Sequence, residues 1–151
     1  MLKRTLSICF IAAGGLTACG GEDRLSQQEF SSQLTPKVER VMTQFGTVFE
    51  TLGQAEETDT VPADVRRQLA EAARVEQAVA DQIDALNPPA NAERATNELA
   101  VAAERQADRL QSVAAREDLT VKEMADAIEG GATFEALARL QELGYVRLPP
   151  R

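Results

Sequence analysis

Histidine and tryptophan are absent from the sequence, and its 151 residues include only two cysteines, one tyrosine and five phenylalanines. Histidine is the commonest general base in enzymes, it completes the Ser-His and Cys-His catalytic pairs, and it is a usual zinc ligand. Its absence excludes those mechanisms and the usual zinc sites. We therefore expect a non-enzymatic protein with no catalytic residues, no metal and no cofactor.

Basic residues are also scarce, because 16 Lys and Arg stand against 24 Asp and Glu, for a net charge of −8. Binding to nucleic acid requires clusters of Lys and Arg that contact the phosphate backbone. Anionic lipid headgroups repel an acidic surface for the same electrostatic reason. We therefore expect no nucleic-acid partner, and we expect the folded body to stand clear of the membrane surface.

The apolar run near the N-terminus is too short to span a bilayer, which takes about 20 residues. It covers 11 residues, 6–16, and follows the basic pair Lys3 and Arg4. A basic start, a short apolar middle and small residues before a cleavage point are typical of a secretory signal. The sequence therefore predicts that residues 1–18 are an export signal that is removed.

Leu16, Thr17, Ala18 and Cys19 follow this run and resemble the lipobox of bacterial lipoproteins, which is an aliphatic residue, two small residues and an obligatory cysteine. The resemblance implies that Leu16, Thr17 and Ala18 form the signal peptidase recognition site. It also implies cleavage before Cys19 and a diacylglyceryl group on its sulfur, with acylation of the new amino group in many bacteria. Ordinary secretory cleavage and an uncleaved anchor are the alternatives. Ordinary cleavage prefers a small residue where Leu16 stands.

A lipobox implies a mature protein attached to the cell envelope on the extracytoplasmic side, with its membrane partner bound through the lipid on Cys19. Two acyl chains give stable attachment, at about 0.8 kcal/mol per buried methylene. Gly20 follows the cysteine in place of Asp, which implies the outer membrane if the cell has two membranes. Cys9 leaves with the signal, so the mature chain has no cysteine pair and depends on packing for its stability.

Removal of the signal leaves 14 basic and 24 acidic residues, a mature net charge of −10. The predicted tether covers residues 19–25. Ser26 and Glu29 then have capping-box spacing and open a helix over 26–52, whose apolar residues recur in steps of three and four. Pro36 interrupts this stripe, so the helix either bends there or begins with Thr35 as its cap.

Two more long helices follow, over about 62–86 and 90–116, separated by Asn87-Pro88-Pro89. Glu76 occupies an apolar position in the stripe of the first of them. The second has mostly alanine on its apolar face, with Gln106 at one stripe position, and alanine contributes little buried area compared with leucine. These patterns predict antiparallel neighbours joined by a short link.

A broken fourth helix is predicted over 120–143, because Thr120 and Glu123 repeat the capping-box spacing and Gly130-Gly131 interrupt the pattern. The fold class is therefore all-α: an antiparallel bundle of three long helices and a broken fourth over 26–144, followed by an extended tail, 145–151. The fourth segment either completes the bundle, which we favour, or caps one end of it.

Residues 119–145 also resemble the helix-turn-helix of MerR-type regulators, in the Thr-Val-Lys-Glu-Met-Ala start and the Leu-Gly-Tyr end. DNA binding does not follow, because the expected second helix has few basic residues and the body is acidic. Two short packed helices give the same spacing. We therefore interpret this segment as part of the bundle.

Two pairs of acidic residues each share a helix face: Asp81 with Asp84, and Glu104 with Asp108. In a chain this acidic, such pairs are more often solvated surface residues than groups that carry out acid/base chemistry. Helical spacing likewise favours a core over a ligand groove for the apolar stripes. Residues 26–30 follow a short spacer, and Leu86-Asn87-Pro88-Pro89 lies between two expected helices. In these features the whole chain resembles small helical envelope lipoproteins, a resemblance that implies no activity. The sequence therefore predicts a structural or interaction role with an envelope protein partner. The alternative is binding of an apolar or lipidic ligand between the alanine-lined helices.

Overall fold

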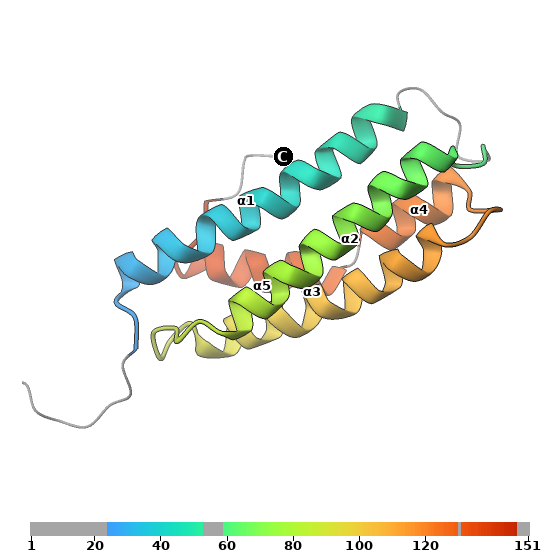
Figure 1. The fold of residues 1–151 in the computed structure, drawn as a ribbon. Coiled ribbons are helices and arrows are strands. Elements are labelled where there is room, and N and C mark those ends of the chain that lie inside the picture. The colour runs from blue at the N-terminus through green and yellow to red at the C-terminus, as the bar shows by residue number, and fades with distance from the viewer. Residues whose placement is uncertain (1–23, 53–58, 130, 148–151) are drawn as a thin grey trace, which may run out of the picture.

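The computed structural model describes residues 24–52, 59–129 and 131–147. The signal, the lipobox and most of the tether predicted above lie outside these residues. The regular elements of the described part are five helices: α1 (Gln27–Leu52), α2 (Ala63–Asp84), α3 (Glu93–Ala114), α4 (Val121–Ile128) and α5 (Gly131–Glu142). Figure 1 shows three long helices side by side, with α4 and α5 following one another. The predicted all-α bundle is confirmed.

The first helix begins at the predicted capping box and continues through Pro36. The Glu29 backbone N–H donates to the Ser26 hydroxyl at 3.3 Å, and the Ser26 N–H donates to the Glu29 carboxylate at 3.0 Å. Pro36 removes one backbone hydrogen bond from the helix interior. Phe30 and Leu34 before it and Val38 after it are all buried on one face, so packing holds the two halves of α1 together.

The second and third helices have 22 residues each and are shorter than the sequence predicted. Pro62 precedes α2 as its N-cap residue, and α2 ends at Asp84 ahead of the proline pair. Before α3 the chain forms a turn in which the Ala92 N–H donates to the Pro89 carbonyl at 2.8 Å. The link between α2 and α3 is therefore longer than predicted, because residues predicted to belong to each helix form part of the turn.

The broken fourth segment completes the bundle, since α4 and α5 both pack against α3. The capping box of α4 is present: the Glu123 N–H donates to the Thr120 hydroxyl at 3.3 Å, and the Thr120 N–H donates to the Glu123 carboxylate at 3.0 Å. After α5 the chain turns at Gly144, whose φ of 80° suits glycine, which has no Cβ. The predicted broken segment thus consists of two short helices, α4 and α5, that pack against the same neighbour.

Replacing Thr120 by alanine should lower the free energy of unfolding by about 1 kcal/mol, because the hydroxyl satisfies a backbone N–H at the start of α4. Thr120→Ser keeps the hydroxyl and should stay within about 0.5 kcal/mol of the wild type. Urea unfolding followed by circular dichroism measures both variants. Wild-type stability in the alanine variant would contradict the role of the cap.

The buried apolar residues form two clusters along the bundle. The Phe30 cluster, which includes Phe30 and Leu140, lies at the end of the bundle where α1 begins. The Leu69 cluster, which includes Leu69 and Leu110, lies toward the other end. Val41 of α1 is partly buried and packs against both clusters. The middle of α1 therefore marks the boundary between the two cores.

The folded unit extends past both predicted boundaries. Tyr145 and Val146, assigned above to an extended tail, are buried with 2% and 3% of their surface exposed. The Tyr145 ring meets Phe30 edge to face at a centroid distance of 5.1 Å, and its hydroxyl donates to the Asn91 side-chain oxygen at 2.8 Å. At the other terminus the Leu25 N–H donates to the Asn87 carbonyl at 2.8 Å. Leu25 and Tyr145 thus both help to close this end of the bundle.

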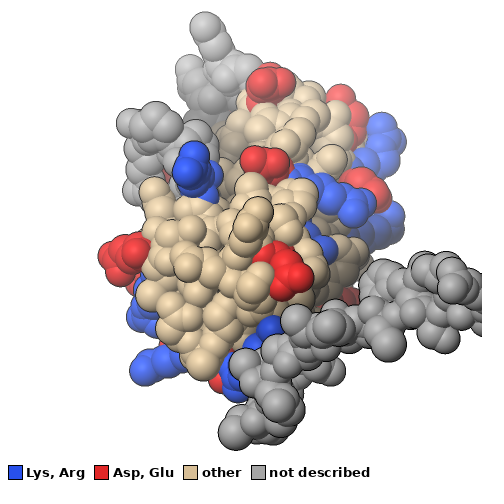
Figure 2. Space-filling view, turned by 90° about the vertical axis from the view of Figure 1, so that its left-hand side faces the viewer, with Lys and Arg blue, Asp and Glu red and all other residues tan. Residues whose placement is uncertain are grey.

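Figure 2 views this end of the bundle. Acidic and basic side chains are scattered around a broad uncharged area, and charges of one sign do not gather into a patch on this face. The pairing of Arg24 with Glu93, at 2.9 Å, belongs to the same end of the bundle. The excess of acidic residues in the chain therefore does not form an acidic patch on this face.

Candidate functional site

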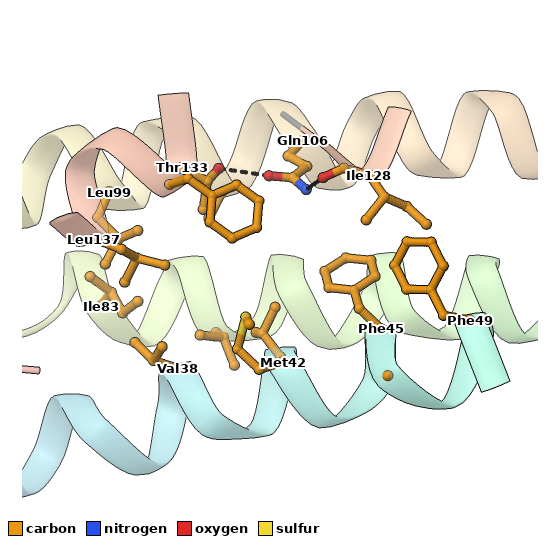
Figure 3. Close-up of a pocket in the computed structure, with 15 residues that line it drawn as sticks. Val38, Met42, Phe45, Phe49, Ile83, Leu99, Gln106, Ile128, Thr133 and Leu137 are labelled. Carbon is orange, nitrogen blue, oxygen red and sulfur yellow. Dashed lines mark hydrogen bonds between the residues drawn. The ribbon is translucent and has the colours of Figure 1, made fainter. Parts of the chain in front are cut away.

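A cleft of about 240 Å³ lies between the two clusters. Residues of α1 line one side, residues of α3, α4 and α5 the other, and two residues of α2 lie between them (Figure 3). The lining residues are apolar except for a glutamine and a threonine: Val38, Val41, Met42, Phe45, Gly46, Phe49, Val79, Ile83, Leu99, Ala103, Gln106, Ile128, Thr133, Phe134 and Leu137. The sequence predicted most of these positions as core, and the structure places them around an open space.

Small residues and the arrangement of the helices keep this space open. The main packing partner of α1 is α2, while α4 and α5 pack against α3 on the other side. At the cleft, α3 presents the short side chain of Ala103 and α1 presents Gly46. A Cβ added at Gly46 would meet no atom within 4 Å. The cleft therefore exists because neither helix supplies a side chain large enough to fill it.

The two polar lining residues, Gln106 and Thr133, are hydrogen-bonded to each other. The Thr133 hydroxyl donates to the Gln106 side-chain oxygen at 2.7 Å, and the Gln106 amide nitrogen donates to the Ile128 carbonyl at 2.8 Å (Figure 3). These bonds connect α3 to the end of α4 and the start of α5. Since the polar atoms are engaged with one another, the cleft offers mainly apolar contacts to a ligand.

Exposed apolar side chains lie at the edge of the cleft. Met42 is 38% exposed and Phe49 is 45% exposed, and both belong to the cleft wall formed by α1. Figure 3 shows Phe45 and Phe49 directed from α1 toward the side that holds Ile128. A concave apolar surface with a few polar groups is the usual form of a small-molecule site. The arrangement can thus hold an apolar molecule without any covalent chemistry.

A buried carboxyl lies close to this site along α2. Glu76 is 1% exposed, and neither of its carboxyl oxygens has a hydrogen-bond partner in the described part of the protein. Burial raises the pKa of Glu76 to about 8. The side chain is therefore mainly uncharged at neutral pH. Its position in the apolar stripe was visible in the sequence, but its isolation from other polar groups depends on the packing of the bundle.

Other predicted site residues fall into two groups. Leu16, Thr17, Ala18 and Cys19 lie outside the described residues, so their proposed roles stay predictions. The four carboxylates in the two acidic pairs named above are exposed, as their sequence context predicted.

The described residues show no candidate metal site and no candidate membrane span. Among the described residues, no group of three or more His, Cys, Asp or Glu side chains is arranged to hold a metal ion. None of the helices in that part of the chain combines the length and apolar character needed to cross a membrane. No protein-family model, no curated protein and no solved structure matches this chain.

Proposed function

We propose that this protein is a lipid-anchored, non-enzymatic protein of the cell envelope whose helical bundle binds an apolar molecule in the cleft. The observation that carries the binding function is the 240 Å³ cleft and its apolar lining. An apolar cavity of about 150 Å³ binds a molecule the size of benzene. The cleft therefore has room for a larger apolar group, such as a short alkyl chain. The anchor is proposed from the lipobox resemblance at Cys19.

The distribution of exposed apolar residues favours a small ligand over a protein partner. The large apolar side chains with the greatest exposure in the described residues are Met42, Phe49, Val101 and Leu143. Met42 and Phe49 belong to the cleft, while Val101 and Leu143 do not line it. Protein interfaces generally need a contiguous apolar patch, and singly exposed apolar residues are ordinary surface features. The predicted structural or interaction role therefore becomes the second candidate.

A cleft-filling variant tests the binding function. The neutral fluorophore N-phenyl-1-naphthylamine should bind the mature chain carrying Cys19→Ala, which retains every described residue and needs no detergent. Gly46→Leu should weaken binding about tenfold or more, equivalent to about 1.4 kcal/mol, because the new side chain occupies the cleft. Fluorescence titration measures the affinity.

Thr47→Leu provides the matched control, because it adds the same side chain at an adjacent exposed position that does not line the cleft. Its affinity for the fluorophore should equal that of the unaltered chain. Gly46→Leu should also raise stability, since glycine disfavours a helix interior by about 1 kcal/mol, so unfolding cannot explain a loss of binding. Absence of saturable binding, or equal binding by both leucine variants, would contradict the proposal.

A further inference from the structure

Glu76 lies on α2 next to the part of that helix that lines the cleft. Val79 of α2 lines the cleft, and Glu76 is one helical turn before it. Ala72 and Ala73 of the same helix belong to the Leu69 cluster, whereas Val79 belongs to the Phe30 cluster. Glu76 therefore lies between the two clusters, as the cleft does.

Glu76 and Gln106 are both buried polar residues, but they differ in their hydrogen bonding. Gln106 bonds to both Ile128 and Thr133, as described above. Glu76 is almost fully buried, and neither of its carboxyl oxygens has a partner. Buried polar groups in native proteins nearly always have partners, and an unpaired one destabilises the fold. An unpaired carboxyl in a stripe otherwise made of Val, Leu, Ile and Ala therefore suggests a binding role.

We propose that the ligand of the cleft is an aliphatic primary amine, whose chain occupies the apolar cleft and whose ammonium group pairs with the Glu76 carboxylate. This inference rests on the proposed function. When the ammonium group binds, the buried Glu76 acid releases its proton to solvent, because the ammonium supplies the hydrogen-bond donors and the opposite charge that stabilise a carboxylate. The net charge of −10 predicted for the mature chain also favours a cation over an anion approaching the protein.

The pairing requires a movement of one side chain. Glu76 is not among the residues that line the cleft, and its neighbour in the wall is Val79. Glutamate has several rotatable bonds, and changes of rotamer on binding are common. The proposed pairing therefore requires a rotamer change at Glu76 that turns its carboxyl toward the cleft beside Val79.

Three probes with the same chain length test this assignment: octylamine, 1-octanol and octanoate, each used to displace N-phenyl-1-naphthylamine from the mature Cys19→Ala chain. Octylamine should displace the fluorophore at a concentration at least tenfold lower than 1-octanol, and octanoate should be the weakest. Glu76→Gln should remove the advantage of octylamine over 1-octanol. Glu76→Leu gives a second reading if the amide is not tolerated in the core.

Asp81→Asn is the matched control, because it also removes one acidic group from α2, but at an exposed position. It should keep the preference for octylamine. Equal displacement by the three probes, or a preference for octylamine that survives both Glu76 variants, would overturn the amine assignment and leave the apolar cleft standing. Failure of the fluorophore and of 1-octanol to bind would instead overturn the proposed function itself.

Discussion

Replacing Glu76 by glutamine should remove most of the pH dependence of folding stability between about pH 4.5 and pH 8. Burial is the cause that raises the pKa of Glu76 from 4.5 to about 8, and no neighbouring charge contributes to the shift. Between these values the folded state holds a proton that the unfolded state has released. The free energy of unfolding of the wild type should therefore fall as pH rises, by up to about 1.4 kcal/mol per pH unit, and level off above pH 8.

Urea unfolding at a series of pH values from 5 to 9 measures this slope. Glu76→Leu should be more stable than the wild type at pH 9, because it removes a buried charge without a partner. Glu104→Gln is the control, since Glu104 is exposed on α3, and it should keep the wild-type slope. A wild-type stability that does not change across this range would show that Glu76 is not held in an apolar environment.

Below pH 4.5 the folding stability should depend on Glu123, a different carboxyl from Glu76. Hydrogen bonds from the Thr120 backbone and hydroxyl and from Arg116 lower the pKa of Glu123 to about 2. Its contribution to stability is therefore present above its ordinary pKa near 4.5 and is lost as pH falls toward 2. The titration of Glu76 is thus separated from that of the α4 cap, because the two lie on opposite sides of pH 4.5.

Replacing Cys19 by alanine should release the protein from membranes and abolish its labelling with palmitate. Attachment of diacylglycerol requires a thiol, and the lipobox resemblance places that thiol at Cys19. Cys9→Ala is the matched control, because Cys9 lies within the predicted signal and should leave labelling unchanged. Membrane fractionation with radiolabelled palmitate distinguishes the variants. Continued membrane attachment of the Cys19→Ala protein would contradict the lipid anchor.

Local sequence signals were sufficient to predict that the helices form, although α2 and α3 are shorter than predicted. The capping boxes at Ser26 and Thr120 each depend on a side chain three residues further on, so both were recognisable in the sequence. Apolar residues at steps of three and four predicted the buried faces for the same reason. Pro36 left two possible starts for the first helix, and the burial of Phe30 and Leu34 ahead of it explains why the helix begins earlier.

Contacts between distant residues could not be predicted from these signals. Tyr145 follows Gly144 at the end of the last helix, where the sequence alone suggested an extended tail. Its burial depends on Phe30 and Asn91, which come from two other parts of the chain. An aromatic residue near a chain end carries no local mark of the partner that will cover it.

By itself the sequence determined the helical class, the helix caps and the presence of Glu76 in an apolar stripe, because these depend on residues within one or two turns. Only the tertiary structure decided that the stripes surround a cleft. That outcome depends on α1 packing against α2 while α4 and α5 pack against α3, and on Gly46 and Ala103 facing the space between them. Periodicity tells which face of a helix is buried, whereas the volume left between helices depends on side chains from all of them together.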